Sequence, residues 1–591
     1  MSGFVAIIAS QPDREVSSAD VDAFAGSYGA IRGGPGELVV AGGRIGAVPF
    51  PRMDGSGLDT RRRGDSWALS VGAPHYSGSL LDAPLGAMEG QFVLLRHDAE
   101  TNTITVATDP FGMFALFVAE RLGLTYVSTS ALALALHLKL GASRLGLLTF
   151  LLAGYHCGTR TNWDSVERIG AGIRIDFSPD GQRTSRYWRP VVDHSIHRLG
   201  IAASVDRCLE PAVEAVRTAG AGRDVLWCDL TGGYDTRILA LLARRAGLSF
   251  ITSTNGTENE EDVHLARQIA HTAGWEWSLL SLPEWWEQQM LPQRLREAVG
   301  WGDGAIDAEQ LAGVLWGHEL KAERTRAVLN GGGGEHYWSY AWQQEYGHSG
   351  RSGRTNLDLW VRSRMLRAVS VEVFARDPRR EVVADLRARI EPVIEPYLDD
   401  PRAVQADALY LHKSTGHFGA YASAGACYVD VLLPFYTRAS FTAAFSTNPR
   451  HRSGHRFYRR LIDRLDPRIA AIPTAKGGPA QPLRPGNVTA FAPYYTRLGE
   501  KGLNKAAERL LGKSLRRPRG IDDDSAARAR AAFVAQVGAN IDRWHSRAMY
   551  NPARLSDMLA AAGRPDFRDS VLLGRILTAE LSLRAAGAVV D

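Results

Sequence analysis

Cysteine is scarce in this chain, and its scarcity excludes two kinds of architecture. Four cysteines occur among 591 residues, at positions 157, 208, 228 and 427, and no pair of them has the spacing C-x-x-C. Thiols so far apart in sequence fit neither a disulfide framework nor a zinc site. We therefore predict reduced thiols and a cytoplasmic protein.

Long hydrophobic runs are absent as well. The most apolar stretch, residues 145–155, is shorter than the about 20 residues that a membrane-spanning helix needs. Residues 1–8 contain no basic region and only a short apolar run, which does not fit a signal peptide. We predict no membrane span and no secretion signal.

An excess of one charge is also missing. The chain has 69 basic and 64 acidic residues, a net charge of +5. The short arginine runs at 61–63 and 516–519 lie in polar stretches and indicate solvated loops, although a basic surface for an acidic peptide or phosphate ligand fits them too. No nucleic-acid-binding motif is found, so we expect no nucleic acid partner.

Two regions differ in their predicted secondary structure. In residues 1–195, short β-type runs alternate with Gly, Pro, Asp and Asn turns, which is typical of a layered β structure. The predicted strands there are 4–8, 38–40, 91–95, 103–107 and 125–128, and the predicted helices are 19–25 and 131–138.

Residues 196–591 begin with helices and strands in alternation. The predicted order is a helix over 201–219, a strand over 225–230, a helix over 234–246, a strand over 248–253 and a helix over 263–273. This order with short links predicts a parallel sheet with crossover helices. Beyond residue 355 the pattern is mostly helical, and the charged residues 512–530 predict a loop.

The strongest chemical signal lies between the 225–230 strand and the helix that follows it. Residues 229–237 read Asp-Leu-Thr-Gly-Gly-Tyr-Asp-Thr-Arg, so two glycines form a tight turn at a helix N-terminus. The N–H groups of such a turn and the positive end of the helix suit a pyrophosphate. Asp235, in the first helical turn, is placed to hold Mg²⁺ against the phosphates. An ordinary strand-to-helix turn fits these letters equally well.

A second glycine turn follows a later apolar strand. Residues 328–338 read Val-Leu-Asn-Gly-Gly-Gly-Gly-Glu-His-Tyr-Trp. Four successive glycines cost backbone entropy, which favours a packing or ligand reason for them. Glu335 is a candidate second carboxylate for Mg²⁺; the alternative is a flexible loop with an exposed acid.

Together and in this order, the two turns resemble the asparagine synthetase family. The S-G-G-x-D-S signature of that family is similar to residues 231–236, and its G-D-G-x-D-E segment to residues 331–336. Residues 260–267 resemble its D-x-x-x-A-R helix, 430–435 its E-x-R-x-P-F segment and 473–478 its R-x-K-x-G segment. Residues 88–92 and 109–112 resemble segments of its N-terminal amidotransferase domain. Each motif alone is weak, but their collinear order covers almost the whole chain.

The resemblance implies an α/β fold in two domains. Residues 1–195 would form a degenerate glutamine amidotransferase-like domain with the αββα layers of an Ntn hydrolase. Residues 196–591 would form an ATP-dependent synthetase domain with the parallel sheet of an adenine-nucleotide α-hydrolase, a pyrophosphate loop and a helical tail.

The resemblance also implies roles for single residues. The implied ATP-binding residues are Thr231, Gly232, Gly233, Tyr234, Asp235, Thr236, Arg237, Thr252 and Gly333. Asp235 and Glu335 would hold Mg²⁺. Lys476 would stabilise the oxyanion or the phosphates, and Asp430 would help to deprotonate the attacking ammonium. A surface lysine, a structural carboxylate and an arginine paired with a nearby acid are the alternatives for Lys476, Asp430 and Arg237.

Departures from the family pattern bear on the expected chemistry. The family hydrolyses glutamine with an N-terminal cysteine, whereas Ser2 stands near the N-terminus here and no cysteine precedes Cys157. We therefore expect a retained scaffold instead of a glutaminase; a serine nucleophile at Ser2 would be much harder to ionise. Gly332 and Glu335 replace both aspartates of G-D-G-x-D-E, and Leu432 replaces the arginine of E-x-R-x-P-F, which predicts a reshaped acceptor pocket.

Without ammonia from glutamine, the attacking amine has to come from the substrate. The resemblance then implies a lasso-peptide macrocyclase, which adenylates an Asp or Glu side chain of a ribosomal precursor peptide and joins it to the N-terminal amine of that peptide. AMP and pyrophosphate would be released. The implied partners are the precursor (core) peptide, a leader peptidase and a leader-recognition protein.

Three alternatives stay open. A β-lactam synthetase-like ring closure obeys the same logic, but that group carries a tyrosine where Gly332 stands. An asparagine synthetase that uses free ammonia is the second. The third is a scaffolding relative with a decayed nucleotide site, against which the retention of Gly232, Gly233, Asp235 and Lys476 argues.

Overall fold

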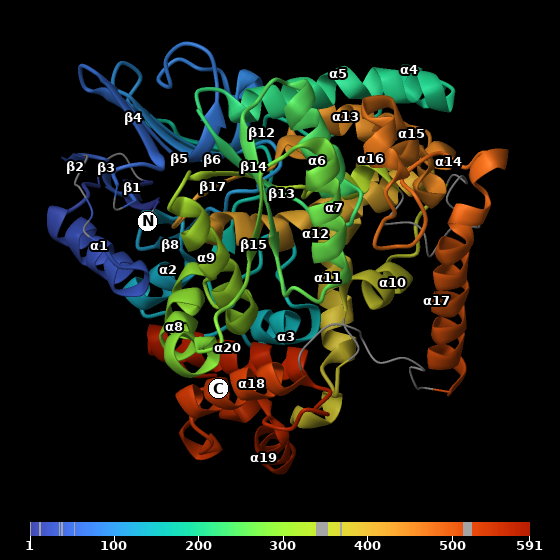
Figure 1. The fold of residues 1–591 in the computed structure, drawn as a ribbon. Coiled ribbons are helices and arrows are strands. Elements are labelled where there is room, and N and C mark those ends of the chain that lie inside the picture. The colour runs from blue at the N-terminus through green and yellow to red at the C-terminus, as the bar shows by residue number, and fades with distance from the viewer. Residues whose placement is uncertain are drawn as a thin grey trace.

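The computed structural model describes residues 2–10, 14–34, 36, 40–52, 54–338, 353–366, 369–511 and 523–590. Two antiparallel sheets come first along the chain, and a parallel sheet and a long helical part follow (Figure 1). The change from antiparallel to parallel pairing falls between residues 186 and 226.

The two antiparallel sheets have six strands each. The first has the order β10-β8-β9-β1-β3-β2 and the second the order β12-β11-β7-β6-β5-β4. The strands of the first are β1 (Gly3–Ala9), β2 (Val40–Gly42), β3 (Ile45–Phe50), β8 (Phe117–Arg121), β9 (Leu124–Ser128) and β10 (Glu167–Arg168). Those of the second are β4 (Leu58–Arg63), β5 (Ser66–His75), β6 (Glu89–Asp98), β7 (Thr103–Thr108), β11 (Ile173–Ser178) and β12 (Gly181–Arg186).

Strand β1 is buried along its whole length because both of its faces are covered. Phe4, Ala6 and Ile8 pack in the core between the two sheets, as the period of two along a strand requires. Val5 and Ile7 pack in the core that also holds side chains of α1 (Ser18–Arg32), α2 (Ala131–Leu138) and α3 (Arg144–Ala153).

The outer face of the second sheet is covered differently. Leu80, Ala83, Leu85 and Met88, from the segment that links β5 and β6, pack on Phe92 and other buried residues of that face. The αββα prediction is therefore correct in its two sheets and one helical layer. Among the described residues before α4 (His194–His197), we find no second helical layer.

The parallel sheet has five strands in the order β15-β14-β13-β16-β17. They are β13 (Leu226–Asp229), β14 (Phe250–Asn255), β15 (Trp277–Leu280), β16 (Ala327–Leu329) and β17 (Asp430–Leu432), and every pairing between them is parallel. Successive strands lie on one side of β13 and then on the other, so the order reverses between β13 and β16. Ligands of such sheets bind outside the carboxyl ends of the strands at this switch point.

Helices cover both faces of the parallel sheet. Side chains of α5 (Ile201–Gly220), α6 (Asp235–Arg245) and α7 (Glu261–Ala273) join the core on one face. On the other face, Trp227, Ile251 and Val328 pack with Ala322 of α9 (Ala308–Ala322). Strands buried on both sides are apolar throughout, which is why 225–230 was identifiable from its letters.

The helical part of the chain begins between β16 and β17 and continues beyond β17. Its helices are α10 (Leu357–Trp360), α11 (Arg379–Ile394), α12 (Arg402–Gly425), α13 (Arg438–Ser446), α14 (Pro449–Arg452), α15 (Arg456–Leu465), α16 (Pro467–Ala471), α17 (Ala492–Leu511), α18 (Asp523–Val537), α19 (Pro552–Ala561) and α20 (Ser570–Ala586), and α8 (Leu291–Trp301) precedes it. The predicted loop over 512–530 is wrong at its end, because residues 523–530 lie in α18. Alanine, the best helix former, is frequent there. Residues 512–522 lie outside the described ranges.

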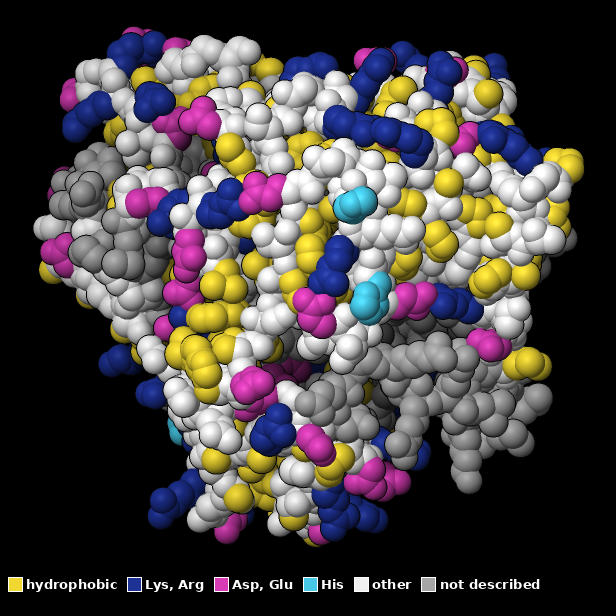
Figure 2. All heavy atoms as spheres, viewed as in Figure 1, with side chains coloured by type: hydrophobic (Ala, Val, Ile, Leu, Met, Phe, Trp, Pro, Cys, Tyr) yellow, Lys and Arg dark blue, Asp and Glu magenta, His cyan; other side chains and the backbone are white. Residues whose placement is uncertain are grey.

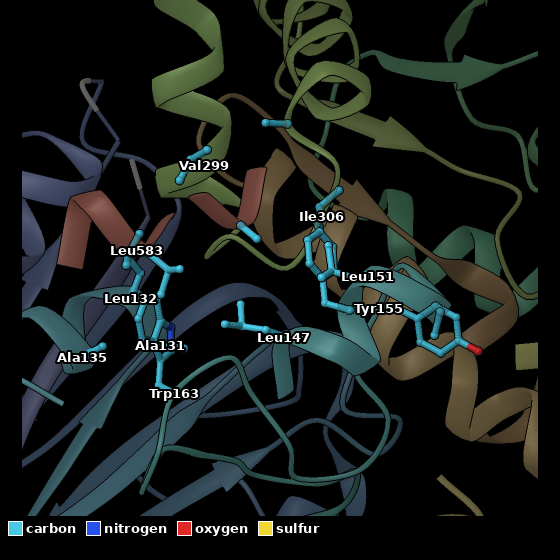
Figure 3. Close-up of a cluster of buried hydrophobic side chains, with 14 of the residues drawn as sticks. Ala131, Leu132, Ala135, Leu147, Leu151, Tyr155, Trp163, Val299, Ile306 and Leu583 are labelled. Carbon is cyan, nitrogen blue, oxygen red and sulfur yellow. The ribbon is translucent and has the colours of Figure 1, made fainter. Parts of the chain in front are cut away.

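The largest core joins both ends of the chain. In Figure 3, Leu583 of α20 lies beside Leu132 of α2, and Leu147 and Leu151 of α3 face the same cluster. The C-terminal helices α18 to α20 lie together at one end of the molecule (Figure 1). The predicted boundary at residue 195 therefore separates kinds of sheet, while the hydrophobic core continues across it.

The surface and the thiols agree with the composition. Lys and Arg side chains are interspersed with Asp and Glu on the face in Figure 2, without a single basic field. All four cysteines are described, buried and free. No helix in the described ranges is both long and apolar enough for a bilayer crossing.

Candidate active site

The sheet order brings the two glycine turns together. Thr231 follows β13 and Asn330 follows β16, and these neighbouring strands flank the switch point. Gly331 touches the start of α6, because a methyl group built on it would lie 3.3 Å from the carbonyl carbon of Asp235 and from the nitrogen of Thr236. Segments about a hundred residues apart in sequence thus meet at one edge of the sheet.

Hydroxyl groups shape the first turn. Thr231 Oγ1 accepts a hydrogen bond from Gly233 N at 3.1 Å, and Thr236 Oγ1 accepts one from Thr231 N at 3.0 Å. Gly232 N donates to Asp262 Oδ1 at 3.0 Å, so a carboxylate from α7 already binds this turn. Helix α6 starts at Asp235 and adds the positive end of its dipole. The turn therefore has the geometry of an anion site.

Tyr458 of α15 links the two turns. Its hydroxyl donates to Asp235 Oδ1 at 2.6 Å and is also within hydrogen-bond distance of the Gly334 carbonyl oxygen. Gly334 must be glycine, since a methyl group there would lie 2.6 Å from Asp235 Oδ1. Gly333 has a φ of 92°, and a methyl group built on it would lie 2.8 Å from the ring of Tyr436. Packing thus explains two of the four successive glycines.

Asp235 and Glu335 are close enough to affect the protonation of one another. Burial raises the pKa of Glu335, and the negative charge of Asp235 raises it further. Burial also raises the pKa of Asp235, against the opposing effects of Tyr458 and Lys476. Two carboxylates whose charges disfavour each other suit a divalent cation with oxygen ligands such as Mg²⁺. In the described ranges no three His, Cys, Asp or Glu side chains form a metal cluster.

Lys476 lies on a turn that is attached to the first glycine turn. Ala475 N donates to the Gly232 carbonyl oxygen at 3.0 Å. The Lys476 ammonium lies 3.6 Å from the centre of the Trp338 ring and 3.1 Å from His455 Nε2. Its charge lowers the pKa of both Asp235 and Glu335, so it belongs to the same electrostatic site.

Arg237 does not have the predicted contact with phosphate. Its side chain is completely buried, and its guanidinium donates to the carbonyl oxygens of Ile472 at 2.9 Å and Pro473 at 2.8 Å. It also reaches those of Ile469 at 3.2 Å and Gly232 at 3.4 Å. Arg237 therefore joins α6 to the segment before Lys476, and the prediction of a ligand contact is corrected to a positioning role.

Thr252 and Asp430 also lie outside the site. The hydroxyl of Thr252, in the middle of β14, donates to the Glu276 carbonyl oxygen at 2.7 Å. Asp430 is the first residue of β17 and pairs in register with Ala327, the first residue of β16. It lies at the amino edge of the sheet, opposite the glycine turns, and forms ion pairs with Arg52 and Arg223. The catalytic assignment of Asp430 is therefore wrong. A sequence motif does not specify how strands align in a sheet, so the motif could not show at which edge Asp430 lies.

Ser2 has no open surroundings. It is 1% exposed, and its hydroxyl donates to the Ala426 carbonyl oxygen at 3.1 Å. Arg52 Nε donates to the same oxygen at 2.7 Å. Packing against the helical part of the chain thus encloses the Ser2 hydroxyl.

Sequence reasoning missed several residues of the site. Tyr458 and His455 match no motif, and aromatic residues in a helical stretch resemble ordinary core residues. Trp338 stands in the second glycine segment but was given no role there. Tyr234 was expected at the nucleotide, and its ring stacks on His455 with 4.7 Å between ring centres. Asp229 and Asn330 could have been predicted as site residues, because each is a polar residue at the end of an apolar strand.

Fold and site define an α/β protein with glycine turns, paired carboxylates and a lysine at the switch point of a parallel sheet. No protein-family model matches the chain, and no curated protein matches it. Among solved structures it is similar to "glutamine phosphoribosylpyrophosphate (PRPP) amidotransferase from B. subtilis complexed with ADP and GMP", at 11% identity and a TM-score of 0.22 over 47% of this chain and 65% of that one.

A second similar structure is "structure of the allosteric regulatory enzyme of purine biosynthesis", at 10% identity and a TM-score of 0.20 over 44% of this chain and 66% of that one. The chain spans just under two thirds of either of these proteins. TM-scores this low do not establish a shared fold.

Proposed function

We propose that the protein is an ATP-dependent, AMP-forming amide ligase of the asparagine synthetase type. One observation carries the proposal: two glycine turns, Asp235, Glu335 and Lys476 meet at the switch point of a parallel sheet. Anion-binding turns, oxygen ligands for a cation and a fixed ammonium group are the parts that nucleotide activation of a carboxylate needs. The domain assignments, an Ntn-type N-terminal domain and an α-hydrolase-type synthetase domain, are part of this proposal.

The reaction proceeds in two steps. A substrate carboxylate oxygen attacks the α-phosphorus of ATP, and pyrophosphate leaves with the electron pair of the broken P–O bond. An amine then attacks the acyl carbon, and AMP leaves. The N–H groups of residues 232–235 would hold the pyrophosphate, for which those of Gly232 and Gly233 have to exchange their hydrogen bonds to Asp262 and Thr231 for phosphate oxygens. Asp235 and Glu335 would hold Mg²⁺, and the Lys476 ammonium would stabilise negative charge on the reacting oxygens. Bound Mg²⁺ offsets the charge of the phosphates.

The proposed substrate is a ribosomal precursor peptide. The buried Ser2 favours an amine from the substrate itself over ammonia from glutamine. The protein would join an Asp or Glu side chain of the core peptide to its N-terminal amine in the cytoplasm. A leader peptidase and a leader-recognition protein would act beside it.

The test is ATP–pyrophosphate exchange with synthetic peptides that each carry a free N-terminal amine and one Asp or Glu side chain. Wild-type protein should exchange label with at least one peptide, and Asp235→Ala should lose the exchange by about 100-fold or more. Asp430→Asn is the matched control, because this carboxylate lies at the opposite edge of the same sheet.

Other outcomes separate the alternatives. Exchange with free aspartate, followed by asparagine formation from ammonium chloride, would replace the peptide substrate with a small amino acid. No exchange with any acid, although the purified protein is folded, would contradict the ligase proposal.

A further inference from the structure

A polar cluster lies near the carboxyl edge of the parallel sheet, on the face covered by α9. Its members are Asp229, Ser253, His318, Lys321 and Asn330. Asp229 is the last residue of β13. Its neighbour Leu230 is buried in the core on the α5–α7 face, whereas Trp227, two residues earlier, packs on the α9 face. Side chains alternate between faces along a strand, so Asp229 points to the α9 face.

Two side chains hold the Asp229 carboxylate. Lys321 of α9 forms an ion pair with Oδ1, and Asn330 Nδ2 donates to Oδ2 at 2.8 Å. Asn330 Oδ1 in turn accepts from Gly332 N at 2.9 Å. Asp229 is therefore linked by two hydrogen bonds to the glycine turn that carries Glu335.

The cluster has hydrogen-bonding capacity left over. Ser253 is the register partner of Asp229 on β14, and its Oγ is buried without a partner. His318, about one helical turn before Lys321, has a buried Nδ1 without a partner, and burial lowers its pKa, assisted by the charge of Lys321 and opposed by that of Asp229. Each such atom destabilises the fold unless a water or a ligand group satisfies it.

The Asp229 side chain is partly open to solvent, as is Asn330. The side chain of Asp229 is 20% exposed, while that of Lys321 is 2% exposed. A carboxylate oxygen has more than one lone pair, so Asp229 can accept hydrogen bonds besides those from Lys321 and Asn330. An incoming group at this edge therefore meets a carboxylate acceptor whose charge is shared with the buried Lys321 ammonium.

We infer that Asp229 binds the amine that attacks the acyl-adenylate, a role that the position of Asp430 excludes for that residue. The inference rests on the proposed function and names the amine site of that reaction. A carboxylate suits a cationic or hydrogen-bond-donating amine, whereas the ATP phosphates at the neighbouring turn would be repelled by it.

The role of Asp229 is binding and orientation. Lys321 holds the pKa of Asp229 below its usual value despite burial, so the carboxylate is a poor base. When the amine nitrogen bonds to the acyl carbon, the bond from that carbon to the AMP oxygen breaks and AMP takes its electron pair. The proton lost by the amine passes to water.

The experiment separates the two half-reactions in Asp229→Asn, which keeps the shape of the side chain. Exchange of pyrophosphate with an acidic peptide should stay within about twofold of wild type, while peptide amide formation should fall about 10- to 100-fold, the usual cost of one hydrogen bond to a charged group. Hydroxylamine, a small neutral amine, should still give hydroxamate at high concentration. Asp430→Asn is the matched control and should keep both half-reactions in the wild-type ratio.

The other results of this experiment separate the role of Asp229 from the ligase proposal. Unchanged amide formation in Asp229→Asn would overturn the inference and leave the ligase proposal intact. Loss of exchange, or a raised KM for ATP, would assign Asp229 to the nucleotide instead of the amine. Absence of exchange in wild type would contradict the proposed function itself. If Asp229→Asn does not fold because Lys321 is left buried and unpaired, the double variant Asp229→Asn, Lys321→Met removes that charge and carries the same comparison.

Discussion

Tyr458 is the side chain through which the two glycine turns contact each other. Its hydroxyl lies 2.6 Å from Asp235 Oδ1 and reaches the carbonyl oxygen of Gly334, while its ring stacks with Tyr337 at 6.1 Å between centres. Asp235 is thereby held in one orientation before any cation arrives. Orientation of a ligand side chain by a neighbour usually changes metal affinity measurably.

We expect Tyr458→Phe to weaken the binding of a non-hydrolysable ATP analogue with Mg²⁺ by about 10-fold, in line with the usual effect of a group that orients a metal ligand. Isothermal calorimetry measures this. Tyr337→Phe is the matched control, since the Tyr337 hydroxyl bonds Ser440 Oγ at 2.7 Å, away from the turns. Equal losses of affinity in both variants would show that general packing is responsible.

Glu335 gives the ligand-free protein a stability that depends on pH. Burial, together with the charge of Asp235, raises the pKa of Glu335 to about 8. Between the ordinary carboxyl pKa and this value the native state binds a proton that the unfolded state has lost, so the free energy of unfolding falls as pH rises. Below that window both states are protonated, and the contribution is fully present.

We expect Glu335→Gln to flatten this dependence. Urea unfolding at about pH 6 and about pH 9, without Mg²⁺, should show a smaller fall in stability for the variant than for wild type. Adding Mg²⁺ should stabilise wild type at the higher pH and leave the variant nearly unchanged. Parallel pH profiles for the two proteins would contradict the placement of Glu335 beside Asp235.

At the scale of elements, α6 and the segment that carries Lys476 form one unit. Arg237 donates to carbonyl oxygens at Ile469, Ile472 and Pro473, and Ala475 N donates to Gly232. Burial lowers the pKa of Arg237 to about 10, but its guanidinium stays charged at neutral pH. The position of Lys476 therefore depends on a side chain that touches no ligand.

We expect Arg237→Met to lower the free energy of unfolding by about 2–4 kcal/mol, because several buried carbonyl groups lose their donor. The variant that folds should also bind the Mg²⁺–ATP analogue more weakly. Arg244→Met, on the same helix, removes a partly exposed ion pair with Asp466 and should cost at most about 1 kcal/mol. Chemical denaturation of both variants measures the difference.

The elements that the sequence predicted well are those with a clear hydrophobic period. The helix expected at 131–138 coincides with α2, and the helix expected at 201–219 ends one residue before the end of α5. Strand β4 was missed because Leu58–Arg63 is an edge strand with a charged, exposed face and no apolar alternation. The expected strand at 38–40 lies outside the described residues except for Val40, which begins β2.

Residue roles were predictable only where letters determine geometry. Two glycine turns and a motif predicted that Asp235, Glu335 and Lys476 lie at one site, and the structure brings these three residues together, while their roles toward a ligand stay predictions. Register is not written in a motif, so Asp430 was placed at the wrong edge of the sheet. The role of Arg237 was predicted wrongly. The sequence does not distinguish a buried arginine that donates only to carbonyl groups from one that binds phosphate.

In the whole molecule, the two antiparallel sheets contact the helical part of the chain, and Ser2 is buried where they meet. Ser2 and Arg52 both donate to the Ala426 carbonyl oxygen. Arg52 also pairs with Asp430, so the part of the chain with the antiparallel sheets is joined to the amino edge of the parallel sheet.

We expect Ser2→Cys to remain without glutamine hydrolysis, because the residue is buried against the helical part of the chain. An enzymatic assay for glutamate release, with and without alkylation of thiols, measures this. Release of glutamate that alkylation abolishes would show that position 2 is accessible and would contradict the scaffold interpretation.

A crystal structure with Mg²⁺ and a non-hydrolysable ATP analogue would show whether the two glycine turns form a nucleotide site. We expect phosphate oxygens on the N–H groups of residues 232–235, with the cation between them and the carboxylates of Asp235 and Glu335. A nucleotide bound elsewhere, or an intact Gly232–Asp262 hydrogen bond with no phosphate at the turn, would contradict this expectation.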